Sequence, residues 1–142
     1  MHKVVYRKTS EADFEGVSKL LAQAKLREPY FTRDRFENML ARNRGFCYVA
    51  EDEVEIIGNV FGTHDGGFIG YLRKIAVKEV YRRQKIASNL VRIAVEKFEE
   101  AGIPLIFAHV EKTNEPSLGL LKSLGFEIRD SHYLIDRGYE KK

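Results

Sequence analysis

A run of strand patterns followed by one long helix pattern limits most strongly what this chain can fold into. Three consecutive segments are rich in strand-forming residues: 46–50, 55–62 and 68–77. Short polar connections separate them, and Asp65-Gly66-Gly67 is typical of a tight turn. From residue 83 to 101 the apolar period changes to 3.6 residues, which predicts a helix. We therefore expect a three-strand meander with a long helix packed against it.

Shorter patterns flank this centre on both sides. Before it, the sequence predicts a strand at residues 4–8, a helix at 11–26 and a second helix capped by Thr32. After it come a strand at 104–110, a helix capped by Asn114 and closed by Gly125, and a terminal hairpin of residues 126–128 and 133–135. This order mixes a meander with strand–helix–strand crossovers, so we expect one mixed sheet covered by helices on both faces.

Length and composition indicate one domain, residues 1–142, with 44% hydrophobic and 32% charged residues. The single cysteine, Cys47, excludes an internal disulfide and a multi-cysteine zinc site, and we expect no metal. It lies within an apolar strand pattern, which favours core packing over a nucleophilic role. Neither a secretory signal nor an apolar run of about 20 residues is present, so we expect a cytoplasmic protein that does not enter membranes.

Basic residues gather at the start of the long helix. The chain has 24 Lys and Arg against 21 Asp and Glu, a net charge of +3, and much of this excess surrounds one turn, at Lys74, Lys78, Arg82, Arg83 and Lys85. The first N–H groups of a helix have no internal partner and bind anions such as phosphates. The alternative is an ordinary solvated charged face. The P-loop and G-x-G-x-x-G patterns are both missing, which argues against the common nucleotide folds.

Two segments resemble the motifs of one family. Residues 82–87, Arg-Arg-Gln-Lys-Ile-Ala, resemble the [RQ]-x-x-G-x-[GA] pyrophosphate loop of the GNAT superfamily of acyl-CoA N-acyltransferases. Val110-x-x-x-Asn114-x-x-Ser117, followed by Leu-Gly-Phe at 124–126, is similar to the family's second conserved block. The order of elements agrees as well, so the likeness extends over residues 3–139.

This resemblance implies an α/β, GNAT-like three-layer fold. Its sheet would be mixed, mostly antiparallel and of about seven strands, with helices on both faces. The sheet would be splayed between the central strand that ends near Val77 and the strand that ends near Val110. A neighbouring pair of parallel strands that separates in this way leaves a gap, and the resemblance implies that a thioester enters it.

The resemblance also implies acetyl-CoA as the acyl donor co-substrate. The residues implied to bind it are Ile75, Ala76, Val77, Arg82, Arg83, Gln84, Lys85, Ile86, Ala87, Ser88 and Asn114. One of them departs from the family pattern, since Lys85 stands where glycine is usual. If the loop requires a positive φ there, the side chain costs roughly 1 kcal/mol or more.

Direct transfer to an amine needs a group that accepts its proton. By resemblance to the ribosomal-protein alanine acetyltransferases, this position falls on His109, and histidine changes charge near neutral pH. A histidine packed at a strand end is the alternative. Tyr71 and Glu111 are further catalytic candidates. Leu121 replaces the tyrosine that protonates the departing thiolate in many members, which leaves Tyr71 and Tyr133 as substitutes.

Acceptor contacts are expected from Tyr30, Phe31 and His64, although Tyr30 and Phe31 equally fit a hydrophobic staple and Asp65 fits a plain turn. The predicted function is transfer of acetyl from acetyl-CoA to the primary amine of a small molecule or peptide. The alternatives are a CoA-binding GNAT-like protein without catalysis and a nucleic-acid-binding module. The small local charge excess argues against nucleic acid. A homodimer is left open, because edge strands near the C-terminus can pair between chains or stay free.

Overall fold

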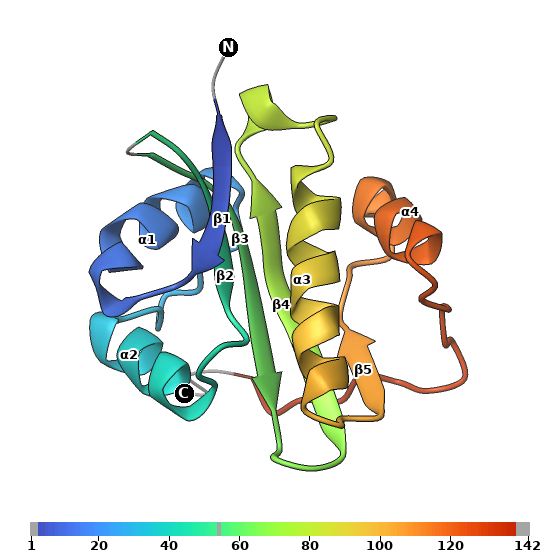
Figure 1. Ribbon diagram of the computed structural model, residues 1–142. Helices are drawn as coiled ribbons and strands as arrows, with labels where there is room; N and C mark the ends of the chain where they lie inside the picture. Colours follow the sequence, from blue (N-terminus) through green and yellow to red (C-terminus); the bar gives the residue numbers. More distant parts are fainter. Residues whose placement is uncertain (1–2, 54, 139–142) are drawn as a thin grey trace.

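A five-stranded mixed sheet organises the part of the chain that the computed structural model describes, residues 3–53 and 55–138 (Figure 1). The strands lie in chain order: β1 (Val4–Lys8), β2 (Tyr48–Asp52), β3 (Glu55–His64), β4 (Ile69–Val77) and β5 (Leu105–Ala108). β1 to β4 pair antiparallel, whereas β4 and β5 pair parallel. This confirms the predicted α/β class with a mixed, mostly antiparallel sheet.

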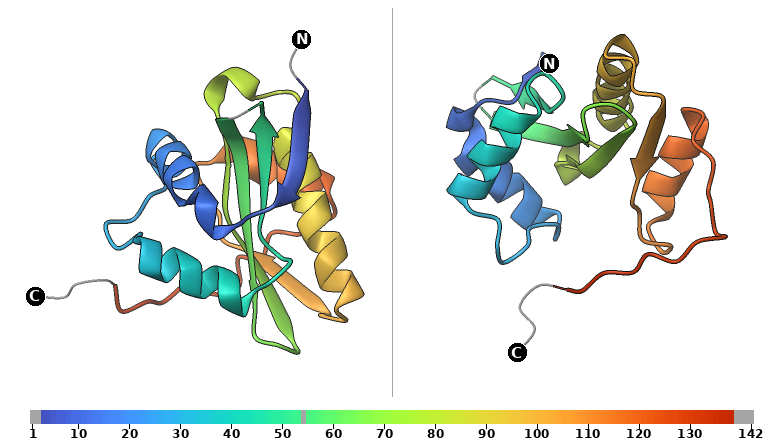
Figure 2. Two further views of the ribbon diagram at one scale, coloured as in Figure 1. Left: turned by 60° about the vertical axis from the view of Figure 1, so that its left-hand side comes forward. Right: turned by 90° about the horizontal axis from the view of Figure 1, so that it is seen from below.

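Helices cover both faces of the sheet, so the fold has three layers (Figure 2). On one face lie α1 (Phe14–Gln23), which follows the short 3₁₀ helix η1 (Glu11–Asp13), and α2 (Arg33–Arg42). On the other lie α3 (Ile86–Glu100) and α4 (Glu115–Ser123). The predicted caps are present: Thr32 Oγ1 accepts from the Arg35 N–H, and Asn114 Oδ1 accepts from the Ser117 N–H at 3.3 Å.

Each face of the sheet has its own apolar core. Leu72, Leu90 and Phe98 belong to the core beneath α3, and Gly70 lets this helix approach closely, because a Cβ there would lie 2.8 Å from the Phe98 ring. Cys47 belongs to the core beneath α1 and α2. Burial raises the pKa of its thiol to about 11, so almost no thiolate exists at neutral pH and the predicted core role is confirmed.

Two expectations about the C-terminal part are wrong. Within the described residues the sheet has five strands rather than about seven, and residues 126–128 and 133–135 form no hairpin. Ile128, Leu134 and Ile135 are exposed instead. Residues 133–135 are all apolar, so apolar and polar residues do not alternate along the segment. The pattern therefore does not specify which face of a strand would pack on the core. Two short strands without a third partner are only marginally stable.

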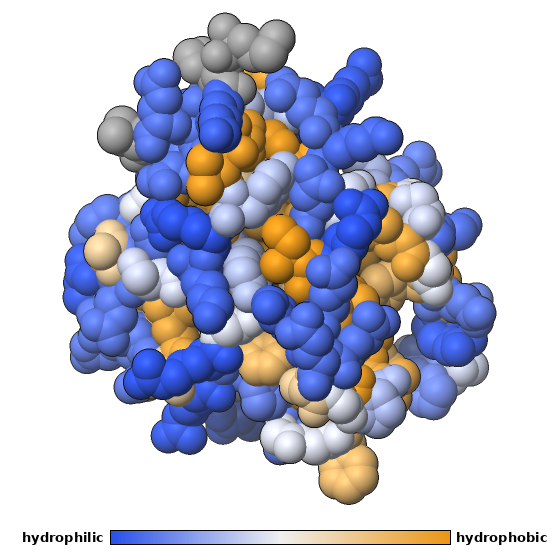
Figure 3. Space-filling model, in the orientation of Figure 1, coloured by the Kyte–Doolittle hydropathy of each residue, from blue (hydrophilic) through white to orange (hydrophobic). Residues whose placement is uncertain are grey.

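The polar surface agrees with the charged composition (Figure 3). On the face shown, hydrophilic side chains cover most of the molecule and apolar residues show between them along the middle. Among the helices within residues 3–53 and 55–138, none combines the length and the apolar run that crossing a bilayer requires.

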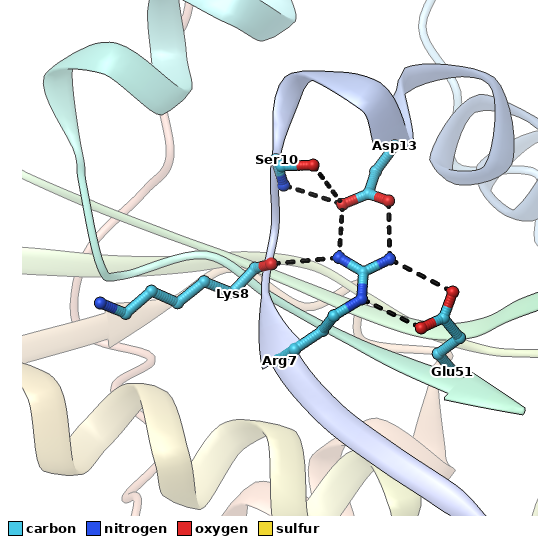
Figure 4. A network of polar contacts seen from close by, with 5 residues as sticks. All are labelled: Arg7, Lys8, Ser10, Asp13 and Glu51. Carbon is cyan, nitrogen blue, oxygen red and sulfur yellow. Dashed lines mark hydrogen bonds and ion pairs between the residues drawn. The ribbon is translucent and has the colours of Figure 1, made fainter.

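Arg7 in β1 binds two carboxylates, that of Asp13 in η1 and that of Glu51 in β2 (Figure 4). Its guanidinium donates to both carboxylate oxygens of Asp13 at 2.8 Å and to Glu51 at 3.0 Å. Burial of Asp13 opposes its ionisation, but hydrogen bonds from Arg7 and Ser10 outweigh this effect, so the pKa of Asp13 is lowered. The network holds η1 and α1 against the edge of the sheet.

Asp13→Asn should lower the free energy of unfolding by about 2 kcal/mol at neutral pH, because Arg7 loses a buried charged partner. A carboxyl whose pKa is lowered by folding stabilises fully above its unfolded pKa of about 3.9, and this stabilisation is lost as the pH falls through the lowered value. Urea unfolding should therefore show the difference shrinking in acid. Asp136→Asn, at an exposed position, is the matched control. Equal losses in both variants would contradict the network's role.

Candidate active site

The two parallel strands β4 and β5 separate halfway along β4. Their pairing ends at Leu72 opposite Ala108, although β4 continues to Val77. Beyond Leu72, β5 supplies no partner to β4 within the described residues. The backbone edge of β4 that faces the gap is therefore available to an extended ligand. This is the splayed arrangement expected from the sequence.

A bulge in β4 redirects the strand where the gap opens. The register with β3 shifts between Asn59 and Phe61, and Lys74 has a φ of 55°. The fully buried Asn59 donates from Nδ2 to the Lys74 carbonyl at 2.9 Å, which fixes the bulge from the neighbouring strand. Lys74 itself pairs with Glu28 at 2.6 Å, so the same bulge is also tied to the loop between α1 and α2.

A cavity of about 650 Å³ opens beside this gap, within the usual range of ligand sites. Every residue predicted to bind the donor lines it, with the single exception of Gln84. β4 supplies Ile75 to Val77, and Asn114 stands across from them at the start of α4. Asn114 uses its Oδ1 to cap α4, and its Nδ2 donates to none of the described residues.

The N-terminus of α3 forms one end of the cavity. The helix begins at Ile86, and no side chain caps it. The N–H groups of Ile86, Ala87 and Ser88 belong to its first turn and have no partner within the helix. No acidic residue stands in that turn to compensate the positive end of the helix dipole. Unpaired donors and a cavity therefore coincide here, which suits a phosphate.

Only part of the predicted basic cluster is available to an anion. Lys74 pairs with Glu28 and Lys78 pairs with Glu55, which neutralises both lysines. Arg82, Arg83 and Lys85 are exposed, line the cavity and form no ion pair with any described residue. The positive charge at the cavity therefore comes from these three residues.

The predicted strain at Lys85 is present. Lys85 has a φ of 63° and lies in the left-handed region, as does Arg83 with a φ of 68°. This conformation suits glycine and costs a residue with a side chain roughly 1 kcal/mol or more. The loop accordingly stores strain at the point where the helix donors are presented.

Lys85→Gly should raise the free energy of unfolding by about 1 kcal/mol, because glycine adopts this φ without a steric cost. Gln84→Gly is the control, since Gln84 is a direct neighbour without a positive φ and should only lose stability. Thermal or urea unfolding of both variants measures the difference. A loss of stability in Lys85→Gly as large as in Gln84→Gly would contradict the strain.

The predicted catalytic residues lie near the mouth of the gap, outside the donor cavity. The Tyr71 ring centre is 6.0 Å from that of His109 and 5.8 Å from that of Phe107. His109 follows the last residue of β5 and is exposed, so it is not packed into the core. Glu111 is also exposed, and because β5 ends at Ala108, strand alternation does not place it beside His109.

Few tyrosines remain as proton donors to a thiolate. Leu121 is buried in the core beneath α3, and Tyr133 is 93% exposed on the C-terminal segment and does not line the cavity. Tyr81 does line the cavity, but its hydroxyl donates to Asp52, which raises the pKa of Tyr81 to about 12. Tyr71 is therefore the best placed of the predicted donors.

The predicted acceptor residues separate into two places. Tyr30 is half-buried in the loop between α1 and α2, and Phe31 beside it stacks on Phe14 at 5.4 Å within the core, as a staple would. His64 is not on the acceptor side. Its ring packs against Phe46 at 4.5 Å and points toward Phe98 beneath α3. The adjacent Asp65 has the predicted turn role, because its Oδ1 accepts three backbone N–H groups, which lowers its pKa to about 2.

Sequence reasoning missed several residues of this region. The additional residues lining the cavity are Ala24, Leu26, Tyr81, Pro116, Ser117 and Leu120. The helical spacing of Asn114, Ser117 and Leu120 could have indicated the last two. The bulge at Lys74 and its support by Asn59 leave no comparable signal in a strand pattern.

Comparisons with known proteins agree with this geometry. The sequence pattern of the "Acetyltransferase (GNAT) family" matches residues 12–126. N-alpha-acetyltransferase 30 of Dictyostelium discoideum is 32% identical over 111 residues, which are 75% of this chain but only 58% of that protein. The chain thus spans less than two thirds of the length of this relative.

Solved structures share the fold. Ard1 from Thermoplasma volcanium superposes with a TM-score of 0.79 at 21% identity, covering 89% of this chain and 84% of that one. The NatC complex bound to Gag peptide and CoA superposes with a TM-score of 0.77 at 27% identity, covering 88% of this chain and 85% of that one. With the splayed strands, the cavity and the sequence match in agreement, the chain belongs to the acetyltransferase (GNAT) family.

Proposed function

We propose that this protein transfers an acetyl group from acetyl-CoA directly to a primary amine. The observation that carries the proposal is the coincidence of three features at one cavity. Within residues 3–53 and 55–138, these are the uncapped start of α3, the free edge of β4, and the cations Arg82, Arg83 and Lys85, which form no ion pair there. A long ligand with a diphosphate at one end and an amide-rich arm at the other fits all three.

In this proposal the donor lies with its diphosphate at the first turn of α3. The N–H groups of Ile86 to Ser88 donate hydrogen bonds to its phosphate oxygens, and the neighbouring cations add attraction. The arm runs along Ile75 to Val77 and receives a hydrogen bond from Asn114 Nδ2 on the other side. The thioester then reaches the strand gap, where backbone donors at the β4 bulge polarise its carbonyl.

The chemistry proposed at the mouth of the gap needs little beyond positioning. The amine attacks the thioester carbonyl while neutral, His109 accepts its proton directly or through water, and the thiolate leaves. In this proposal Tyr71, whose ring centre lies 6.0 Å from that of His109, protonates the thiolate. A thiol with an ordinary pKa near 8.5 is a fair leaving group even with weak assistance.

The acceptor we propose is the α-amino group of a peptide. The support is the likeness to N-alpha-acetyltransferase 30 and to a NatC complex bound to a peptide. The acceptor side of the gap is also open, since His109 and Phe107 are exposed along its edge. A small-molecule amine is the alternative acceptor. We propose a cytoplasmic location for this activity, in line with a single buried cysteine.

The test is acetyl-CoA consumption across a panel of amines. Release of free thiol should depend on both acetyl-CoA and a peptide amine, and mass spectrometry should show one acetyl group on the peptide's terminal nitrogen. Tight binding of acetyl-CoA with no transfer to any amine would instead support a CoA-binding protein without catalysis. Affinity for duplex DNA that falls steeply with salt, without affinity for acetyl-CoA, would favour the nucleic-acid module.

A further inference from the structure

A fully buried asparagine lies behind the bulge of β4. Asn59 belongs to β3 and is directly opposite Val49 of β2 and Ala76 of β4. Both of these residues belong to the apolar core beneath α1 and α2, so the Asn59 side chain enters the same core. It has no exposure to solvent. A primary amide in such surroundings is costly unless its polar atoms are hydrogen-bonded.

Only the nitrogen of this amide has a partner among the described residues. Nδ2 donates to the Lys74 carbonyl at 2.9 Å, whereas Oδ1 accepts no hydrogen bond from residues 3–53 or 55–138. Stability alone would favour an apolar side chain of similar size, because such a side chain leaves no buried amide oxygen unpaired. The bond to Lys74 is therefore the contact that distinguishes asparagine from an apolar residue at this position.

The bond reaches Lys74 where its backbone departs from the strand. Lys74 has a φ of 55° and lies in the bulge, where two residues of β4 are opposite one residue of β3. A residue with a side chain keeps a left-handed conformation only where its surroundings fix it, and such residues gather at functional sites. Here Asn59 holds the Lys74 carbonyl, and Glu28 holds the ammonium group at 2.6 Å.

Fixing the Lys74 carbonyl also fixes the next N–H group. No peptide bond in the described part of the chain is cis, and a trans peptide directs its N–H opposite to its C=O. Because the Lys74 carbonyl points toward Asn59 in β3, the Ile75 N–H points away from β3. It therefore points out of the other edge of β4. That edge faces the gap, since pairing with β5 ends at Leu72 and Ile75 lines the cavity.

We propose that Asn59 is a positioning residue, which aims the Ile75 N–H at the thioester carbonyl of the donor. The inference rests on the proposed function and names the side chain that orients one of its backbone donors. A donor at this place stabilises the negative charge that develops on the carbonyl oxygen during attack by the amine. Asn59 does not line the cavity, so it acts through the Lys74–Ile75 peptide and touches no substrate.

Two variants remove the bond with little change in volume. Asn59→Val has no donor, and the hydroxyl of Asn59→Thr stands one bond nearer the backbone than Nδ2. Both should bind CoA, which carries no acyl group, as the wild type does. The probe is acetyl-CoA isotopically labelled at the acetyl carbonyl and bound without an amine. Infrared spectroscopy should show a lower carbonyl stretching frequency in the wild type than in either variant, because a hydrogen bond weakens the C=O bond. With a peptide amine present, kcat should fall by about 100-fold in both variants.

Val49→Ala is the matched control, because Val49 is directly opposite Asn59 and fully buried in the same core but does not belong to the bulge. It should unfold at a lower urea concentration than the wild type. Its carbonyl frequency and kcat should nevertheless equal those of the wild type. If Asn59 only supported the core, the Asn59 variants would likewise leave these two readouts unchanged.

The outcomes separate this inference from the proposed function. An unchanged carbonyl frequency or an unchanged kcat in both Asn59 variants would overturn the inference and leave the proposed function intact. Loss of CoA binding in both variants would also overturn it, because Asn59 would then support the whole site rather than one donor. A frequency difference without transfer to any amine would support the inference and refute the enzymatic activity. Failure of the wild type to bind acetyl-CoA would overturn both.

Discussion

Ala87→Asp should weaken acetyl-CoA binding by roughly 100-fold or more. Ala87 is half-buried in the first turn of α3 and lines the cavity. A carboxylate there stands about 5 Å from a bound phosphate, and at an effective dielectric constant of about 20 the repulsion is about 3 kcal/mol. The added carboxylate also competes for the same N–H groups. Calorimetric titration with acetyl-CoA measures the loss.

Ala101→Asp is the control for this charge. Ala101 caps the other end of α3 and is exposed, and it follows Ala87 by 101 − 87 = 14 residues, which is about 20 Å along the helix. That distance exceeds the Debye length of about 8 Å at physiological salt, so the same charge should leave the affinity unchanged. Unaltered binding in a folded Ala87→Asp protein would remove the phosphate assignment.

His109→Ala should lower kcat by about 100-fold and change the KM for acetyl-CoA little. The His109 ring lies beside the Tyr71 ring at the mouth of the gap, with the ring centres 6.0 Å apart. His109 does not line the cavity proposed to bind the donor. Loss of a positioned base typically costs about 100-fold or more in rate. In the wild type, kcat should depend on pH through this base, and that dependence should disappear in the variant.

His132→Ala serves as the comparison, because His132 is exposed on the C-terminal segment and contacts only the adjacent Ser131 in the described part of the chain. It should retain both the rate and the pH profile of the wild type. If His109→Ala keeps the same profile as the wild type, the base is another group or water, and Glu111 becomes the next candidate to substitute.

Local signals predicted much of this fold. Thr32 and Asn114 cap helices because their side-chain oxygens satisfy otherwise free N–H groups, and such short-range chemistry is visible in sequence. Gly102 and Gly125 end α3 and α4 with positive φ, as expected. The helix start at Ile86 comes three residues later than expected, because Arg83 and Lys85 adopt left-handed conformations that interrupt the helical period.

The residues that line the cavity were predicted better than the position of His64. The cavity is lined by consecutive residues such as Ile75 to Val77 and by one helix start, so a contiguous motif marks them. Acceptor contacts depend on how separate layers meet. The His64 ring lies toward Phe98 of α3 rather than on the acceptor side, and the strand pattern does not encode which sheet face this residue takes.

The central claim is that the free donors of Ile86 to Ser88 bind the diphosphate of acetyl-CoA. A crystal structure of the wild-type protein with CoA tests it most directly. We expect the diphosphate within hydrogen-bond distance of these N–H groups and the pantetheine arm along Ile75 to Val77. CoA bound at another place, or a cavity that stays empty at saturating CoA, would contradict the account.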